Sequence, residues 1–269
     1  MNTIELLNKQ LILNQLKAGV IAQIDSLIIL ETVGSTNNYL LQQNNLPSGY
    51  IVLAEQQTAG RGRRDGRGWV SPFGKNIHLS IGWRFPDATQ LTGLSLAIGV
   101  AVADALQAYG LDGIQVKWPN DIVYRDQKLG GILIETSKTN AGDCQVIIGI
   151  GINVAMPADS GQQIEQVWTD IQTIIGQTPG RNLIVSHLLN ASLPALQRFQ
   201  TEGLAAFKTR WQQLDALAGR AVTVFATQSS NQEGIAQGID DAGFLIVEIN
   251  GTPYRLSSGE VSVRPRQKN

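Results

Sequence analysis

Nine consecutive residues combine four arginines with four glycines: Gly60-Arg61-Gly62-Arg63-Arg64-Asp65-Gly66-Arg67-Gly68. Glycine lets a backbone approach a ligand closely, and planar guanidinium groups bind phosphate oxygens in pairs of hydrogen bonds. This composition predicts an anion-binding loop that is mobile without its ligand, because ordering a glycine-rich segment costs backbone entropy. A solvated linker and an RNA-contacting arginine-glycine segment are alternatives. The segment is single and lies between two predicted strands, which favours phosphate binding.

Two lysine-containing segments are further candidates: 117–121 (Lys-Trp-Pro-Asn-Asp) and 128–131 (Lys-Leu-Gly-Gly). The first places Lys117 at the end of a predicted strand, where sheet enzymes collect ligand-binding groups. Surface lysines and an ordinary Asn-Asp turn are the alternative interpretation. Trp69, beside the arginine loop, could stack on a purine or pack in the core, and the sequence leaves both open.

The remaining reactive residue types give little sign of chemistry. His78 and His187 lie in apolar strand and helix contexts, so we expect both to be structural. The single cysteine, Cys144, is expected to be a small buried hydrophobic residue. The chain has neither a GxxxxGK[ST] segment nor a GxGxxG segment after a strand, which argues against a P-loop enzyme and a Rossmann dehydrogenase.

Apolar patterns predict the elements that position these residues. Strands are expected at residues 27–32, 50–54, 76–84, 114–118 and 145–154, with hairpin arms at 122–124 and 131–135 and a buried helix within 91–106. Gly149 and Gly151 lie on one face of their strand, where something must approach the sheet closely. Helices follow from residue 181, and Pro194 is expected to kink or divide the first. Five short strands after Gly219 predict a small β-barrel.

Composition narrows the function classes. The 269 residues are 43% hydrophobic, and 21 basic against 22 acidic residues give a net charge of -1. The chain therefore has no overall positive charge to attract DNA, RNA or an anionic membrane. Its longest apolar stretch, 91–106, is shorter than the roughly 20 residues of a membrane span. One cysteine and the lack of a signal-peptide pattern lead us to expect a cytoplasmic protein.

Taken together, several segments resemble, in order, the motifs of biotin protein ligases, from about Leu27 to Arg264. The matching segments are 34–37 (Gly-Ser-Thr-Asn), Gln57 with 60–64, 69–72 (Trp-Val-Ser-Pro), 117–121, 128–132, 149–153 (Gly-Ile-Gly-Ile-Asn) and 259–264. The resemblance implies an α+β fold: a mixed β-sheet with helices, like class II synthetase and lipoate ligase cores, in residues 1–218, and an SH3-like β-barrel in 219–269. Asp65 is an apparent insertion, which leaves the match of Arg67 open. The helix-turn-helix domain of some bacterial members is expected to be absent.

The resemblance also implies a two-step reaction. The biotin carboxylate attacks the α-phosphate of MgATP to give biotinyl-5'-AMP. A lysine of the biotin carboxyl carrier protein of acetyl-CoA carboxylase then displaces AMP. Lys117, Lys128 and Arg63 are the implied catalytic residues. The implied biotin-binding residues are Ser35, Thr36, Asn37, Gln57, Arg61, Gly62, Arg63, Lys128, Gly131, Gly149 and Gly151. Those implied for ATP are Arg63, Arg64, Trp69, Lys117, Asn120, Asn153 and Arg264, and Asp121 is the candidate for Mg²⁺.

Two rival functions remain at this stage. Lipoate ligases share the two-step logic, and a biotin-responsive, nucleic-acid-binding regulator is a rival of another class. The net charge and the expected lack of a DNA-binding module argue against the regulator. The sequence leaves a monomer and a homodimer equally open.

Overall fold

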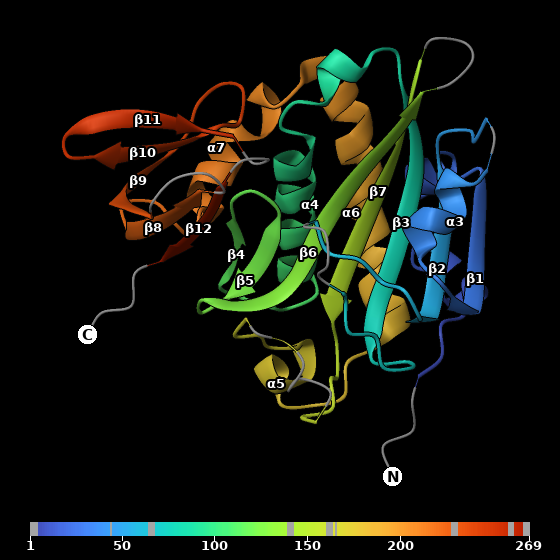
Figure 1. Cartoon of the computed structure of the whole chain (residues 1–269). Coiled ribbons are helices and arrows are strands. Elements are labelled where there is room, and N and C mark those ends of the chain that lie inside the picture. Colours follow the sequence, from blue (N-terminus) through green and yellow to red (C-terminus); the bar gives the residue numbers. More distant parts are fainter. Residues whose placement is uncertain are drawn as a thin grey trace.

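The computed structural model describes residues 5–43, 45–63, 68–138, 143–159, 164, 166–226, 231–257 and 261–265. In this part of the chain seven strands form one mixed sheet, in the order β1-β2-β3-β7-β6-β5-β4 (Figure 1). Among the described strands of this sheet, only β1 and β2 pair in parallel. The strands are β1 (Ser26–Val33), β2 (Tyr50–Gln57), β3 (Asn76–Phe85), β4 (Ile114–Lys117), β5 (Asp121–Tyr124), β6 (Gln127–Lys138) and β7 (Cys144–Asn153).

The two faces of this sheet are covered differently. Helices α4 (Leu94–Ala108) and α6 (Arg181–Glu202) pack on one face, whereas the short helix α3 (Thr36–Leu41) lies on the other (Figure 1). Alternation along the strands explains the division, because successive side chains point to opposite faces. On β3, Ile77, Leu79 and Ile81 are buried in the main core. The residues between them, including His78, face the side of α3.

Small residues keep the α3 face of the central strands open. On β7, Gly149 pairs with Ser80 of β3, and Gly151 pairs with His78. The same two glycines pair with Leu133 and Gly131 on β6. The α3 face of the sheet therefore has a depression over β7, bounded by α3 and the segment around Trp69.

The C-terminal strands form a second sheet, which is antiparallel and has the order β11-β10-β9-β8-β12 among the described residues. These strands are β8 (Ala221–Ala226), β9 (Gln232–Ile239), β10 (Leu245–Ile249), β11 (Thr252–Leu256) and β12 (Val261–Pro265). Helix α7 (Ala205–Leu214) leads into them. The Trp118 indole donates to the Gly243 carbonyl at 3.1 Å, and Arg220 pairs with Asp126 at 2.5 Å. The sheet is thus attached beside the β4–β5–β6 edge.

Shorter helices complete the fold: α1 (Lys9–Leu13), α2 (Ala18–Ile21), α5 (Ile171–Ile175) and a 3-10 turn (Ala88–Leu91). The α+β prediction is confirmed, as are the strands predicted around the arginine loop. Pro194 does not divide the helix, since α6 runs through it, and a kink at this residue stays a prediction. Buried neighbours on both sides, Leu193 and Ala195, keep the two halves in the core. Among the described helices, none has the length and apolar character needed to cross a membrane.

Candidate functional site

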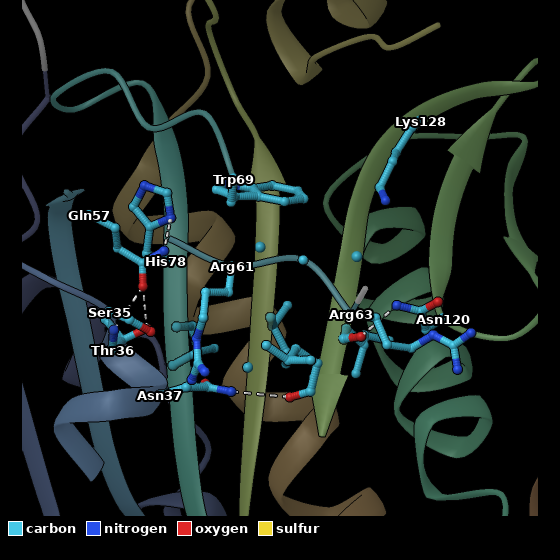
Figure 2. A pocket seen from close by; sticks show the side chains of 18 residues that line it. Ser35, Thr36, Asn37, Gln57, Arg61, Arg63, Trp69, His78, Asn120 and Lys128 are labelled. Atoms are coloured by element: carbon cyan, nitrogen blue, oxygen red, sulfur yellow. Dashed lines mark hydrogen bonds between the residues drawn. The ribbon is translucent and has the colours of Figure 1, made fainter. Parts of the chain in front are cut away.

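A pocket opens on the α3 face, over the glycines of β7 (Figure 2). It brings together thirteen of the residues singled out from the sequence: Ser35, Thr36, Asn37, Gln57, Arg61, Gly62, Arg63, Trp69, Asn120, Lys128, Gly131, Gly149 and Gly151. Five further lining residues were not predicted: His78, Leu79, Ile132, Leu133 and Ile150. Figure 2 shows Ser35, Thr36, Gln57 and His78 at one end, Asn120, Arg63 and Lys128 at the other, and Trp69 between them.

The first end is lined by uncharged polar side chains that bind one another. Ser35 caps α3 by accepting from the Asn38 N–H. The Gln57 Oε1 accepts from the Thr36 N–H at 2.8 Å and lies 3.0 Å from the Thr36 hydroxyl. Ser80 extends the network to Asn37 at 2.6 Å. Because these groups are held by one another, they present fixed donors and acceptors to a ligand without a net charge.

His78 also lines this end of the pocket, while its expected structural role stays a prediction. Its Nε2 lies 2.7 Å from the Ser71 Oγ, and its Nδ1 lies 3.4 Å from the Gln57 Nε2. Burial, with a smaller contribution from the positive charge of Arg181, lowers the pKa of His78 to about 3. The imidazole is therefore neutral at physiological pH. A lone histidine in an apolar strand gave no sequence signal for this position.

Arg61 and Glu135 close one side of the pocket. The Arg61 guanidinium contacts Glu135 at 2.8 Å and also Asn38, while Asn37 Nδ2 donates to Glu135 Oε2 at 2.8 Å. Sequence reasoning missed Glu135. One signal could have suggested it: Glu135 follows Gly131 by four residues, and such residues point to the same face of a strand.

Trp69 lies over the middle of the pocket. A Cβ atom added to Gly151 would come within 2.9 Å of the Trp69 ring, and one added to Gly149 within 2.5 Å of Asn37 Oδ1. The two glycines thus make room for these side chains. The Trp69 Nε1 is buried without a hydrogen-bond partner among the described residues. The Lys128 ammonium lies 5.9 Å from the ring centroid.

The second end carries positive charge. Lys128 pairs with Asp121 at 2.6 Å, and the backbone of Lys128 is fixed by hydrogen bonds to Val167 and Thr169. Burial lowers the pKa of Lys117, with Asp121 opposing and Lys128 and Arg264 adding to the shift. These cations therefore stand close enough to repel one another, and an anion placed among them would relieve that repulsion.

The other predicted residues lie outside the pocket lining. Lys117 and Asp121 flank it at the β4–β5 turn. Asn153 is buried, and its amide donates to the Thr169 carbonyl at 3.0 Å, so that it holds the segment which fixes Lys128. Arg264, on β12, is exposed and lies over Phe225. Arg64, Asp65, Arg67, Gly259 and Glu260 lie outside the described residues.

The geometry suits an elongated molecule with an uncharged polar group at one end and phosphates at the other. Trp69 between the ends offers a flat apolar surface. No cluster of three His, Cys, Asp or Glu side chains that could hold a metal ion occurs among the described residues.

Comparison with known proteins agrees with this geometry. The model of the "Biotin/lipoate A/B protein ligase family" matches residues 29–153, and that of the "Biotin protein ligase C terminal domain" matches 218–264. The bifunctional ligase/repressor BirA of Escherichia coli (strain K12) is 40% identical over 267 residues, covering 98% of this chain and 80% of that protein. The biotin–[acetyl-CoA-carboxylase] ligase of Mycobacterium tuberculosis is 33% identical over 244 residues, 87% of each chain.

A similar solved structure is the biotin protein ligase from Aquifex aeolicus in complex with biotin and ATP. It has a TM-score of 0.77 and 27% identity, with 90% of this chain and 100% of that chain covered.

Proposed function

The chain belongs to the biotin protein ligases, and we propose that its pocket holds biotin at the uncharged end and ATP at the charged end. The enzyme activates biotin with ATP as biotinyl-5'-AMP and transfers the biotinyl group to a protein lysine. One observation supports the residue roles more than any other: a single pocket has a neutral polar network at one end and Lys128 with Arg63 at the other.

At the uncharged end, Ser35, Thr36 and Gln57 suit the polar ureido group of biotin. Arg61, Gly62 and Arg63 line the same pocket and are proposed to cover biotin, Arg63 from the charged end; Asn37 lines the wall. Gly131, Gly149 and Gly151 border the path between the ends. The biotin carboxylate then points toward Lys128. Trp69, beside Lys128, suits the adenine ring, because tryptophan stacks on bases.

The first step joins two anions. The carboxylate oxygen of biotin attacks the α-phosphorus of ATP, an O–P bond forms, and pyrophosphate leaves. Lys128, Lys117 and Arg63 reduce the repulsion as negative charge builds up on the phosphate oxygens. A charge pair at about 4 Å is worth about 1 kcal/mol in water and about 4 kcal/mol at an effective dielectric constant of about 20. Excluding water therefore strengthens these contacts. Arg64, Asn120, Asn153 and Arg264 are proposed to support the nucleotide.

In the second step the amine of the target lysine attacks the carbonyl carbon of the mixed anhydride. An amide bond forms, AMP leaves, and the amine proton passes to phosphate or to a carboxylate. The anhydride must be shielded from water until the acceptor arrives. Arg61 and Arg63, which both line the pocket, are proposed to provide that shield.

Magnesium at Asp121 stays a prediction. Asp121 offers one carboxylate, which is already paired with Lys128. This pairing favours a role for Asp121 in positioning Lys128, with the phosphates of ATP as the main ligands of Mg²⁺.

We propose the biotin carboxyl carrier protein of acetyl-CoA carboxylase as the acceptor, because the relative from Mycobacterium tuberculosis is named as a ligase acting on acetyl-CoA carboxylase. The net charge of -1 supports a function without DNA binding, and the single cysteine fits a cytoplasmic location. A domain boundary at residue 218 is supported by the start of the second sheet at Ala221. Monomer and homodimer both stay open.

Labelling the carrier with biotin or lipoate, side by side and with ATP, tests the function. We expect ATP-dependent transfer of biotin and none of lipoate. Transfer of lipoate in preference to biotin would overturn the assignment.

The substitution Arg63→Gly tests the shielding role. The variant should still form biotinyl-5'-AMP but release it into solution, because one side of the cover is removed. Chromatography of the free adenylate measures the release, and tight retention of the adenylate by the variant would contradict the role.

A further inference from the structure

The strongest unassigned feature is the histidine in the pocket wall. His78 is 2% exposed and lies on β3, on the strand face that looks into the pocket. Its two ring nitrogens meet groups from two other segments: Gln57, at the end of β2, and Ser71, between Trp69 and β3. The motifs that identify the family do not include it.

The hydrogen-bond network fixes which way the Gln57 carboxamide points. Its Oε1 lies 2.8 Å from the Thr36 N–H, which can only donate, so this atom is the oxygen. The Gln57 Nε2 therefore faces His78 Nδ1 and can only donate to it. As a result, Nδ1 must accept.

The same logic fixes the histidine tautomer. A neutral imidazole has one donor and one acceptor nitrogen. With Nδ1 as acceptor, the proton is on Nε2, which donates to the Ser71 Oγ at 2.7 Å. The Ser71 Oγ also accepts from the Gln57 backbone N–H at 2.8 Å. Side chain and backbone of Gln57 are thereby tied to one ring through two routes.

We propose that His78, as the neutral Nε2–H tautomer, is a positioning residue that orients the Gln57 carboxamide for the ureido group of biotin. One Nε2–H of Gln57 donates to His78 Nδ1, and the other Nε2–H is available to donate into the pocket. This inference rests on the proposed placement of biotin. A cationic ring or the Nδ1–H tautomer would place two donors face to face and turn the amide away. The low pKa of His78 and its burial agree with the neutral form.

The histidine content of the chain allows a direct test. His78 and His187 are the only two histidines, so ¹⁵N-histidine labelling gives two ring systems. His187 lies on α6 against Tyr109, away from the pocket, and the variant His187→Asn leaves only His78 signals. We expect ring ¹⁵N shifts of the neutral Nε2–H form at pH 7, with and without biotin. A cation or the Nδ1–H form would overturn the proposal.

Two substitutions separate orientation of Gln57 from mere packing. In His78→Asn an amide oxygen can replace Nδ1 as acceptor, whereas His78→Leu fills space without accepting. We expect His78→Leu to weaken biotin binding about tenfold, near the loss of one hydrogen bond. His78→Asn should stay within about threefold of the unmodified chain, because the acceptor for Gln57 remains.

Isothermal titration with biotin gives the dissociation constant, and the KM for ATP should be unchanged in both variants. Equal biotin affinity in His78→Leu, or equal losses for biotin and ATP, would contradict the proposal. If His78→Leu does not fold, the proposal is tested by the measured tautomer of His78 and by the biotin affinity of His78→Asn. Failure of the unmodified chain to bind biotin would instead reject the proposed function, whatever the tautomer.

Discussion

At one end of the pocket, Gln57, Thr36 and His78 hold one another through hydrogen bonds between uncharged groups, whereas at the other end Lys117 and Lys128 both interact with one carboxylate, Asp121. The first arrangement fixes directions and carries no net charge. The second leaves an excess of positive charge around two half-buried lysines. The difference indicates that the uncharged end selects a ligand by the direction of hydrogen bonds, while the charged end stabilises negative charge that grows during the reaction.

Removing Lys128 is the strongest test of this contrast. We expect Lys128→Gln to slow biotinyl-5'-AMP formation at least about 100-fold, as for loss of a group that stabilises transition-state charge. Biotin affinity should fall less than about tenfold, since the ureido end is untouched. Pyrophosphate release measures the rate, and isothermal titration measures the affinity.

The exposed Lys9, on α1, provides a control in Lys9→Gln, which should keep full activity. Because Asp121 loses its partner in Lys128→Gln, the melting temperature is needed to show that the variant is folded. An unchanged rate of pyrophosphate release would remove Lys128 from the site.

Two glycines on β7 allow the proposed contacts with biotin and with the adenine ring to be perturbed separately. In Gly149→Ala the new Cβ would lie 2.5 Å from Asn37 Oδ1, and in Gly151→Ala it would lie 2.9 Å from the Trp69 ring. We expect Gly149→Ala to raise the KM for biotin about tenfold and Gly151→Ala to raise the KM for ATP about tenfold, each through one displaced contact.

Steady-state kinetics with each substrate varied in turn measures both constants. Gly19→Ala is the control, because a Cβ there meets nothing within 4 Å. If both variants changed both constants equally, the division of the pocket into two ends would be wrong.

Much of this arrangement follows from the sequence, because it depends on local patterns. Alternating apolar residues mark the strands, and the motif segments give the lining residues in their order along the chain. His78 is different, since its partners Gln57 and Ser71 become neighbours only when β2 pairs with β3, as in the register of Ala54 with His78. The neighbouring residues in the sequence therefore predict only a histidine in the core.

The same reason explains other gaps between sequence and structure. The open space at Gly149 and Gly151 was predicted, but not that Asn37 and Trp69 fill it, because these side chains come from distant segments. Glu135 gains its role only by meeting Arg61. Pro194 remains within α6 because tertiary packing outweighs the cost of one missing N–H.

The smallest expected effect concerns the base of the charged end. Asp215 pairs in a β-bridge with Val116, beside Lys117. One of its oxygens accepts from the Leu217 N–H at 2.8 Å, and the other is buried without a partner among the described residues. Burial raises the pKa of Asp215 to about 6. Folding thus raises the pKa of Asp215, whereas it lowers the pKa of His78.

The pH dependence of the free energy of unfolding should therefore separate the two residues. A raised carboxyl pKa means that stability is lost as pH rises from about 4 to about 6, at about 1.4 kcal/mol per unit. A lowered histidine pKa means that stability is gained as pH rises from about 3 to about 6.5. We expect Asp215→Asn to be less stable than the unmodified chain by about 1 kcal/mol near pH 4, because the amide Nδ2 lacks a partner at every pH. Above pH 6 it should be more stable by about 1 to 2 kcal/mol, because the unmodified chain then carries a buried charge that the variant lacks. Urea unfolding at several pH values measures it, with the exposed Asp112→Asn as control. A difference that does not change with pH would mean that Asp215 ionises as freely in the folded chain as in the unfolded one, and that the base of the charged end is more open to water than its burial indicates.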